Sequence, residues 1–591
     1  MNLNKGQFLV LHTLLRFGKI SQRKLSAHTG MSLGKINRLF SELTTLGYIS
    51  NGRITSEGLE VLQPYKVDNA IIMAAGMSSR FAPLSYEKPK GLLVVKGEVL
   101  IERQIKQLQE VGIRDITVVV GYMKERFFYL QEKFGVKIVI NDDYWRYNNP
   151  STLLRVLDQL KNTYICSSDN YFSVNVFEPF VYQSYYSAVF FPGACNEWGL
   201  KYSKAGRITG VDHEPTDMWC MLGHVFFSRS FSQKFSQLLL NEFDKGDTKF
   251  QLWEKLFERN TDQLEMYVRK YGSDEIFEFD SLEELRDFDP HYLENTGSKI
   301  FKNICSVLHC SEAQITDIQI LKKGLTNLSF IFTCNEKQYI YRHPGSGTEK
   351  YISRKSEAFS MKTASDLKLD TTYIHLDAQE GWKLSHYIPQ ARELDYHNWG
   401  EVQKALGLLK RLHSAAIVSP YDFGIWERTK ALLEKVSEKR KDFSDFEELF
   451  SKMQQLNTLA AGDNVPKILC HCDSYDPNFL IDANGEMVLI DWEYSGNDDP
   501  ANDLGTFICC SDYNYEEALH VLELYYERPL THNELRHCLA YIAISSFYWF
   551  VWALYQESIG NIIGQYIYLW YQNTKTYLNR ALPQYYNEEE K

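Results

Sequence analysis

Three patterns of hydrophobic and polar positions follow one another along the chain, and each predicts a different fold. Near the N-terminus, apolar residues recur at helical spacing over 7–17 and again over 32–43. From Val67 onward, short apolar runs alternate with amphipathic stretches, which predicts a sheet covered by helices. Beyond residue 290, strands separated by a glycine turn precede long apolar helices. We therefore expect a multidomain chain with boundaries at 1–66, 67–290 and 291–591.

The first 66 residues predict three helices followed by a hairpin. Ser21 and Ser32 are placed to cap the second and third helices, and Asn51-Gly52 is typical of a tight hairpin turn. This α+β arrangement resembles a winged helix-turn-helix. The resemblance implies a recognition helix with exposed polar residues and a wing tipped by a cation: Lys35, Asn37 and Arg38 on the helix, and Arg53 on the wing.

Charge is divided unevenly between this segment and the rest of the chain. Residues 1–66 hold nine Lys or Arg against three Asp or Glu, a net charge of +6, whereas the whole chain has a net charge of −12. The other residues therefore carry −18, which indicates a basic module attached to an acidic body. DNA or regulatory binding and protein docking are both open for this module, and a homodimer is open as well.

The middle segment contains a glycine loop after an apolar strand. The strand over 67–73 runs into the sequence Ala-Ala-Gly-Met-Ser-Ser-Arg-Phe, and Lys88-Pro-Lys follows. Gly76 would let backbone amides approach a triphosphate, while Arg80 and Lys90 supply positive charge. This combination resembles the sugar-phosphate and phosphocholine nucleotidylyltransferases, with an α/β doubly wound, Rossmann-like fold. The resemblance implies catalytic roles for Arg80 and Lys90 and a nucleotide-binding set of Ala74, Ala75, Gly76, Ser78, Arg80 and Lys90.

Two carboxylates and three tryptophans complete the candidate site of this segment. Asp169 and Asp280 each follow an apolar strand, and the resemblance implies that such a pair holds Mg²⁺ between the nucleotide and the attacking phosphate. For Asp280 the alternative is a structural place beside a helix N-cap. Trp198, together with Trp145 and Trp219, could offer an aromatic face to a quaternary ammonium acceptor, although core packing is the commoner role of a tryptophan.

The spacing His471-x-Asp473-x-x-x-x-Asn478, with Asp491 thirteen residues later, indicates phosphoryl transfer from ATP. Asp473 would accept the proton of an attacking hydroxyl, while Asn478 and Asp491 would hold Mg²⁺ on the phosphates. The apolar runs on either side of residues 482–485 predict a hairpin that brings these metal ligands into one site. The segment resembles the catalytic loop of the kinase-like small-molecule phosphotransferases, which include choline kinases and aminoglycoside kinases.

Upstream residues fit the two-lobed α+β fold of the same family. Thr326 and Asn327 lie in a glycine-containing turn that can cover ATP phosphates. Arg342 ends a strand and Glu357 lies on the next predicted helix, which together resemble the ion pair that positions phosphates. Protein kinases use Lys at this strand position, whereas choline kinases typically have Arg. Arg342 therefore favours the small-molecule branch.

An uncharged run of nineteen residues, 538–556, is long enough to span a membrane. Because it also contains Ser, Tyr, Trp and Gln, we expect a buried helix and no membrane insertion. Its sequence resembles the substrate-binding helix of choline and ethanolamine kinases. Three tryptophans are candidates for a cage around choline, with core packing as the alternative: Trp492, Trp549 and Trp552.

The two halves together indicate a bifunctional enzyme. A choline kinase makes phosphocholine from choline and ATP, and a nucleotidyltransferase of this type would join it to CMP from CTP, with Mg²⁺ at both sites. Ethanolamine, another amino-alcohol or a sugar is an alternative substrate, and a DNA-binding regulator that senses these ligands is an alternative function. Eleven cysteines without a C-x-x-C pair favour a reducing, cytoplasmic setting.

Overall fold

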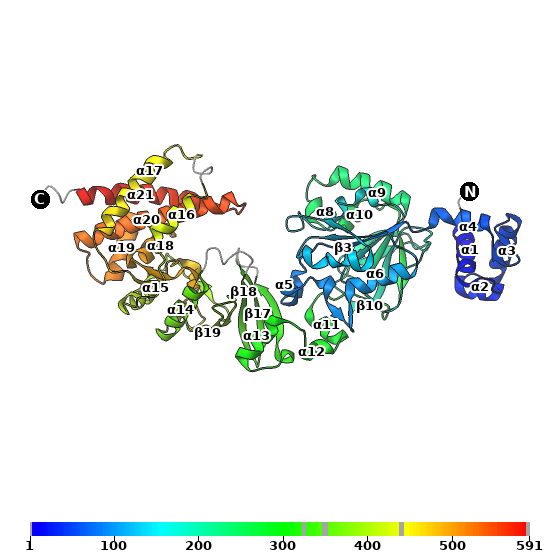
Figure 1. Ribbon diagram of the computed structural model, residues 1–591, viewed down its shortest axis with the longest axis horizontal. Helices are drawn as coiled ribbons and strands as arrows, with labels where there is room; N and C mark the ends of the chain where they lie inside the picture. Colours follow the sequence, from blue (N-terminus) through cyan, green and yellow to red (C-terminus); the bar gives the residue numbers. More distant parts are fainter. Residues whose placement is uncertain (1–2, 322–326, 345–352, 437–441, 587–591) are drawn as a thin grey trace. The chain divides into compact units, whose positions relative to one another are not determined.

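The computed structural model describes residues 3–321, 327–344, 353–436 and 442–586. The chain divides into two compact units, Met1–Asn303 and Ile304–Lys591. Figure 1 labels the helices and strands of each unit.

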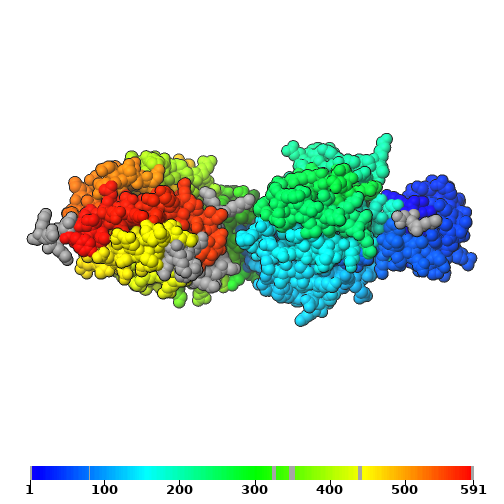
Figure 2. Space-filling view, turned by 90° about the horizontal axis from the view of Figure 1, so that it is seen from above, coloured from blue at the N-terminus to red at the C-terminus, as the bar shows by residue number. Residues whose placement is uncertain are grey.

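Residues 3–62 form a lobe of four helices and a short hairpin. The helices are α1 (Lys5–Phe17), α2 (Gln22–Thr29), α3 (Leu33–Thr45) and α4 (Ser56–Leu62), and the hairpin pairs β1 (Ile49–Ser50) with β2 (Arg53–Ile54). Each helix begins after a polar side chain that accepts a hydrogen bond from a backbone N–H of the first turn: Asn4, Ser21, Ser32 and Thr55. The predicted helices and hairpin are present, and α4 is an addition that the sequence pattern did not predict. Figure 2 shows this lobe in dark blue.

An aromatic cluster attaches the lobe to the remainder of the first unit. Phe8 and Tyr65 pack against Tyr182, with ring centroids 5.4 and 5.5 Å apart. His12 packs against Phe180 with a centroid distance of 6.2 Å. These side chains join the apolar core of the lobe itself, so that the lobe is held through one side of α1.

A nine-stranded sheet organises the rest of the first unit. Its parallel strands lie in the order β7 (Lys137–Ile140), β6 (Ile116–Val120), β3 (Asn69–Ala74) and β8 (Thr163–Ser167), and β13 (Thr216–Phe227) continues it antiparallel to β8. The chain progresses from β3 to β6 and β7 on one side and then returns to place β8 on the other. In open α/β sheets, ligands bind at such a switch point, beyond the carboxyl ends of the strands. A site is therefore expected where β3 and β8 end.

Alternate residues of β3 face two separate cores. Ala70 and Ile72 belong to the core that contains α6 (Leu100–Glu110), whereas Ile71 belongs to the core that contains α9 (Arg229–Glu242) and α10 (Trp253–Arg259). Figure 1 shows α6 and α9 on opposite faces of the sheet. A strand covered on both faces is apolar at successive positions, which explains the continuous apolar run in the sequence. The predicted doubly wound fold is confirmed.

The second unit begins with a five-stranded antiparallel sheet. Its strands lie in the order β16 (Thr316–Leu321), β17 (Asn327–Cys334), β18 (Lys337–Pro344), β20 (Lys383–His386) and β19 (Tyr373–Leu376). Helix α14 (Arg354–Asp366) follows β18. This arrangement provides the strand and helix that the predicted Arg342–Glu357 pair requires.

Helices form the larger part of the second unit. The main ones are α15 (Trp399–Ser414), α17 (Phe446–Ala461), α18 (Pro500–Cys509), α20 (His532–Ser558) and α21 (Tyr566–Tyr586). A short hairpin of β23 (Phe479–Ile481) and β24 (Met487–Leu489) is joined by the turn that the sequence predicted, with Gly485 at φ +81°. The predicted kinase-like α+β architecture is present.

Helix α20 contains the uncharged run of the sequence. Among the described residues it is the one helix that is long and apolar enough to cross a membrane, with a mean hydropathy of 1.5 over its most apolar window. However, 89% of that window is buried inside the protein, where α20 packs against α18 and α21. As predicted from the sequence, it is a buried core helix.

Candidate active sites

Lys90 and Asp169 form a buried ion pair at the carboxyl ends of β3 and β8. Their Nζ and Oδ2 atoms are 2.8 Å apart, and their side chains are only 7% and 16% exposed. The pair depends on a close approach of two loops, because a Cβ added to Gly91 would lie 2.8 Å from the side chain of Ser168. The Ser167 hydroxyl donates a second hydrogen bond to Asp169. The sequence placed both residues in this site, and the structure brings them together.

Opposite charge keeps both members of this pair ionised despite their burial. Burial alone would raise the pKa of Asp169, but Lys90 lowers it below its usual value. Burial would likewise lower the pKa of Lys90, yet Asp169, Glu278 and Asp280 together raise it. The ammonium group of Lys90 therefore lies among three carboxylates.

A second cation–carboxylate pair joins Arg80, which follows the glycine loop, to Asp280, which precedes α11 (Leu282–Phe288). Arg80 Nη1 is 2.9 Å from Asp280 Oδ2, and the Arg80 side chain is 78% exposed. Glu278 interacts electrostatically with Lys90 and Asp169 and accepts a hydrogen bond of 2.8 Å from Asn170. Burial, followed by the charge of Asp169, raises the pKa of Glu278 to about 8. Glu278 adjoins the predicted site residues in sequence, but its place beside Lys90 depends on the fold.

The donor chemistry of this site fits Mg²⁺. Hard divalent cations prefer carboxylate oxygens, and a cation would relieve both the burial and the repulsion by Asp169 that raise the pKa of Glu278. Asp169 and Asp280 are the candidate ligands, as the sequence suggested, and Glu278 joins them as a third. In this structure Lys90 and Arg80 compensate the charges of the two aspartates.

The predicted glycine loop follows β3 directly. Ala74 and Ala75 are buried, and the backbone N–H of Tyr122 donates to the Ala75 carbonyl oxygen. A Cβ added to Gly76 would meet no heavy atom within 4 Å, so the space beside this backbone is open. Ser78 has a φ of +48°. Nucleotide binding by these residues stays a prediction.

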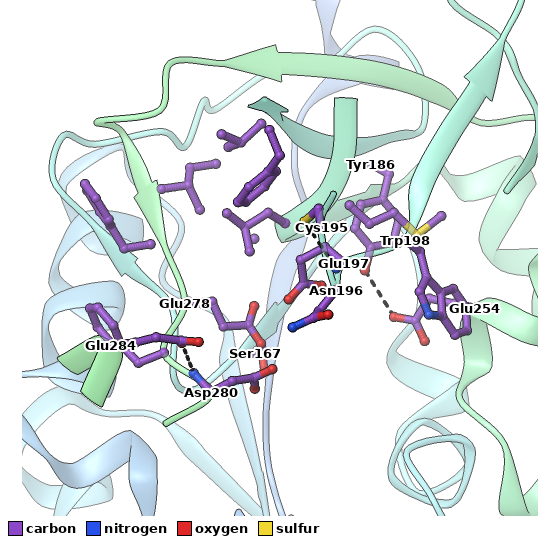
Figure 3. A pocket seen from close by; sticks show the side chains of 18 of the residues that line it. Ser167, Tyr186, Cys195, Asn196, Glu197, Trp198, Glu254, Glu278, Asp280 and Glu284 are labelled. Atoms are coloured by element: carbon purple, nitrogen blue, oxygen red, sulfur yellow. Dashed lines mark hydrogen bonds between the residues drawn. The ribbon is translucent and has the colours of Figure 1, made fainter. Parts of the chain in front are cut away.

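A cavity of about 1200 Å³ opens beside these carboxylates. Figure 3 shows Glu278 and Asp280 on one side of it and Tyr186, Trp198 and Glu254 on the other. Trp198 is the only one of the three candidate tryptophans among the residues that line this cavity. One ring face of Trp198 already has the ammonium group of Lys255 at 4.9 Å.

Two further glutamates face the same cavity. The Tyr186 hydroxyl donates a hydrogen bond of 3.1 Å to Glu254, and burial raises the pKa of Glu254 to about 7. Burial, followed by the charge of Asp280, raises the pKa of Glu197 to about 7. The solvent-accessible surface leaves both residues partly exposed, which is the condition for contact with a ligand. Asn196, Glu197 and Trp198 stand together in the sequence, whereas Glu254 gave no sequence signal.

In the second unit, the segment after β22 (Ile468–Cys470) forms a tightly bonded loop that contains Asp473. Asn478 donates from its side chain to the backbone oxygen of Asp473 at 2.7 Å and to its Oδ2 at 3.1 Å. The Ile490 N–H donates to the Asn478 carbonyl oxygen, which places Asn478 beside the strand end that carries Asp491. Burial, followed by the charge of Asp491, raises the pKa of Asp473 well above its usual value. The three residues predicted for phosphoryl transfer therefore share one site.

Asp503 on α18 holds this loop in place. Its carboxylate accepts hydrogen bonds from the backbone N–H groups of His471 and Cys472, at 2.8 and 2.6 Å. It also lies 2.9 Å from the His413 ring, at the end of α15. Burial would raise the pKa of Asp503, but the hydrogen bond and charge of His413, with those of His471, lower it. Asp503 is thus an ionised structural anchor that the local sequence motif did not identify.

Asp503→Asn is expected to lower the free energy of unfolding of the second unit by about 3 kcal/mol, since it weakens several hydrogen bonds to one buried carboxylate. Urea unfolding followed by tryptophan fluorescence would measure the change. Asp512→Asn is the matched control because Asp512 is exposed and pairs with an exposed histidine. A midpoint for Asp503→Asn equal to that of the control would contradict the anchoring role.

A cluster of carboxylates surrounds the predicted phosphate-binding cation. Arg342 forms an ion pair with Glu357, and its guanidinium lies 3.6 Å from Asp491 and 3.5 Å from Glu493. The carboxylates of Glu357, Asp491 and Glu493 converge within 4.8 Å of one another and could hold a metal ion. Burial and Asp491 raise the pKa of Glu493 to about 7. Glu493 is an additional candidate ligand beside the predicted Asn478 and Asp491.

The predicted Thr326 lies outside the described residues. Asn327 pairs through its backbone with Pro344 at the start of β17, and its side chain also lies outside the described part. Contact of these two residues with ATP stays a prediction.

The aromatic residues of the second unit separate into a core position and a cluster. Trp492 is fully buried, donates its indole N–H to the Leu489 carbonyl oxygen at 3.0 Å and packs against His471. Trp492 was a candidate for the cage around choline, and its complete burial corrects this to the alternative of core packing. Trp549 and Trp552 lie 5.5 Å apart, and both approach Trp570. Trp552 is partly exposed and Trp549 is 5% exposed, so this cluster keeps some accessible aromatic surface.

Comparisons with known proteins match the two halves separately. Residues 70–189 match the family model of the MobA-like NTP transferase domain, and residues 318–542 match that of choline/ethanolamine kinase. The choline-phosphate cytidylyltransferase of Streptococcus pneumoniae is 34% identical over 220 residues, which cover 37% of this chain and 96% of that protein. The 2-aminoethylphosphonate cytidylyltransferase of Lancefieldella rimae is 32% identical over 38% of this chain and 93% of its own length. The crystal structure of choline kinase LicA from Streptococcus pneumoniae is similar at 27% identity, with a TM-score of 0.42, over 48% of this chain and 98% of that one.

Proposed function

Since the chain belongs to the choline-phosphate cytidylyltransferase family, we propose that its two catalytic parts act in succession on one small molecule. The second unit transfers the γ-phosphoryl group of ATP to the hydroxyl of choline and releases ADP. The first unit then joins the phosphocholine to the CMP moiety of CTP and releases pyrophosphate. The chain is accordingly a bifunctional transferase, a choline kinase and a cytidylyltransferase.

In the kinase step, Asp473 accepts the proton of the choline hydroxyl as its oxygen attacks the γ-phosphorus. Asn478 orients this carboxylate through its side-chain hydrogen bond. Arg342, held by Glu357, provides positive charge for the phosphates. Asn478, Asp491 and Glu493 would hold Mg²⁺, which would supply positive charge for the phosphate oxygens. The bonded loop around Asp473 is the observation that supports this step most strongly.

In the cytidylyltransferase step, a phosphate oxygen of phosphocholine attacks the α-phosphorus of CTP, and the bond to pyrophosphate breaks. Lys90 and Arg80 stabilise the charge on the triphosphate, and no covalent intermediate on the protein is needed. Asp169, Asp280 and Glu278 would hold Mg²⁺, which would supply positive charge for the phosphate oxygens. The Lys90–Asp169 pair beside the cavity is the observation that supports this step most strongly.

The two ion pairs of this site predict that Lys90 and Arg80 leave their aspartates when the nucleotide binds. When Lys90 and Arg80 turn toward phosphate oxygens, Asp169 and Asp280 lose their counter-charges, and a divalent cation restores them. We therefore expect metal and nucleotide to bind with positive cooperativity in the first unit.

The far side of the cavity suits the cationic head of the acceptor. Tyr186 and Trp198 supply aromatic surface, and Glu254 and Glu197 supply negative charge when ionised. A trimethylammonium group donates no hydrogen bond, so aromatic and electrostatic contacts are the ones available to it. A primary ammonium would also gain hydrogen bonds to these carboxylates. Choline is our choice, with ethanolamine and 2-aminoethylphosphonate as the alternatives to be tested.

The raised pKa of Glu254 gives acceptor binding a pH dependence. Below about pH 7 the carboxyl group is protonated and neutral, and above it the carboxylate attracts a cation. We expect the KM for phosphocholine at fixed CTP to fall severalfold between pH 6 and pH 8. Glu254→Gln should make this fall smaller, and the part that remains comes from Glu197, whose pKa is also about 7. If the KM of the variant falls as much as that of the wild type, Glu254 is not the cause of the pH dependence.

One incubation tests the whole proposal. Pure protein is mixed with ATP, CTP, Mg²⁺ and choline, and the products are identified by mass. Parallel reactions replace choline by ethanolamine or 2-aminoethylphosphonate, and CTP by UTP. CDP-choline as the main product supports the proposal. No product from choline, together with turnover of another acceptor, would overturn the choice of choline and keep the reaction class.

We further propose that residues 1–66 form a winged helix and that the enzyme works in the cytoplasm. The three capped helices and the Asn51-Gly52 hairpin support the first proposal. Nucleoside triphosphate substrates and eleven unbridged cysteines support the second.

A further inference from the structure

Glu357, in the first turn of α14, has two arginine partners. Its Oε1 pairs with Arg342 on β18, and its Oε2 lies 2.9 Å from Nη1 of Arg354, the residue that begins α14. Glu357 is completely buried, and Arg354 is 9% exposed. The sequence predicts the pair of Arg342 and Glu357, and Arg354 is an addition that the structure makes. One buried carboxylate is therefore held by two buried cations.

The turn between β19 and β20 fixes the side chain of Arg354. A Cβ added to Gly381 would lie 2.7 Å from Arg354 Nε, so a side chain at this position would displace the guanidinium. Gly381 has a φ of +76°, which also favours glycine. The next residue, Trp382, is buried and stacks on Tyr341, the neighbour of Arg342 in β18. The segment that holds Arg354 is thus packed against the strand that carries Arg342.

The first turn of α14 is also bonded to the segment that carries Asp491 and Glu493. The buried hydroxyl of Ser356 donates a hydrogen bond of 2.8 Å to the Ser495 carbonyl oxygen. This bond keeps Glu357 beside the two carboxylates of that segment. Three carboxylates and two arginines therefore share one small region, and removal of one arginine leaves the three carboxylates with a single cation.

Arg342 binds Glu357 through Nη2, whereas its Nη1 lies 3.6 Å from Asp491 and 3.5 Å from Glu493. We propose that Arg354 is a positioning residue for phosphoryl transfer, because it satisfies the second oxygen of Glu357 and leaves Nη1 of Arg342 for the phosphates of ATP. Without Arg354, the buried carboxylate of Glu357 has one cation, and both ends of the Arg342 guanidinium are drawn to it. This inference rests on the proposed kinase step and deepens it.

The test compares Michaelis constants for choline phosphorylation by the full-length protein, measured as ADP release with ATP and choline varied in turn. Arg354→Met should raise the KM for ATP about tenfold, which is the order expected for loss of one hydrogen bond to a charged group, and should lower kcat. The KM for choline should stay within twofold of the wild type, whereas a loosened site would raise both constants. Arg354→Lys keeps a cation and should restore the KM for ATP to within threefold.

Arg392→Met is the matched control. Arg392 lies 2.7 Å from Glu401 in the first turn of α15, as Arg354 pairs with Glu357 in the first turn of α14. Glu401 is buried too, although Arg392 itself is more exposed than Arg354. The control should keep both Michaelis constants within twofold of the wild type. Thermal unfolding shows that each variant is folded at the assay temperature; if Arg354→Met is not, Arg354→Gln takes its place.

Isothermal titration with ATP, without choline and with excess CTP to fill the first unit, measures nucleotide affinity apart from turnover. The variant that removes the Arg354 cation should bind ATP about tenfold more weakly than the control. Unchanged affinity, an equal rise in both Michaelis constants, or a lysine variant as impaired as the methionine one would overturn the role of Arg354. A wild type that binds ATP without phosphorylating choline would overturn the proposed kinase step alone, because the titration still decides the role of Arg354. No binding of ATP by the wild type would overturn both.

Discussion

Asp473→Asn is expected to reduce the rate of phosphocholine formation by about 10³-fold or more, within the range that general-base catalysis contributes. Asparagine keeps the size of the side chain and can still accept the hydrogen bond from Asn478, but it cannot take up the hydroxyl proton. The rate is measured as ADP release dependent on choline, and product is identified by mass.

The control for this variant is Asp476→Asn, which removes a carboxylate three residues later in the same loop. Its rate should stay within threefold of the wild type. Cytidylyl transfer from supplied phosphocholine should be unaffected in both variants. If Asp473→Asn lowers both activities equally, the two sites are not independent; if it keeps normal kinase activity, another group is the base.

Local sequence patterns predicted those parts of the sites in which neighbouring residues act together. The spacing from His471 to Asn478 places its functional groups on one short loop, and the hairpin after it brings Asp491 back to the same place. The apolar runs of β3 and β8 likewise end at the residues that form the first site. Chain connectivity is enough to bring such groups together, so the sequence contains the information.

Partners from distant segments could not be predicted in this way. Asp503 is more than thirty residues from the two backbone N–H groups that donate hydrogen bonds to it. Glu254 belongs to a helix far along the chain from Tyr186, its hydrogen-bond donor. Both contacts require the packing of helices against a sheet or against one another. Nothing in the local pattern around either carboxylate distinguishes it from a solvated acid on a helix surface.

Burial explains the one aromatic prediction that was wrong. Trp492 adjoins Asp491, and the sequence made it a candidate for the cage around choline. The backbone turns sharply at Asp491, where φ is +65°, and the next side chain enters the core against His471. Proximity in sequence to a site residue therefore did not determine the direction of this side chain, whereas the helical spacing of Trp549 and Trp552 did place them together.

Lys90→Met is expected to lower kcat/KM for CDP-choline formation by about 10³-fold and to leave choline phosphorylation intact. Methionine fills much of the same volume without the charge that faces the phosphates of CTP, and such a loss corresponds to about 4 kcal/mol of transition-state stabilisation. The pKa of Asp169 should rise as well, because burial would no longer be opposed by Lys90. Pyrophosphate release from CTP and supplied phosphocholine measures the first effect.

Lys133→Met is the matched control for this variant. Lys133 also forms an ion pair with a buried carboxylate, that of Glu102 at 2.8 Å, but neither residue lines the cavity. If loss of the cation beside a buried carboxylate merely loosens the fold, both variants should lose activity and thermal stability together. If Lys90 stabilises the transition state, its variant alone loses cytidylyl transfer, and the loss persists at temperatures where both proteins are folded. Normal pyrophosphate release by Lys90→Met would contradict this role. Another cation, such as Arg80, would then have to stabilise the charge of the triphosphate.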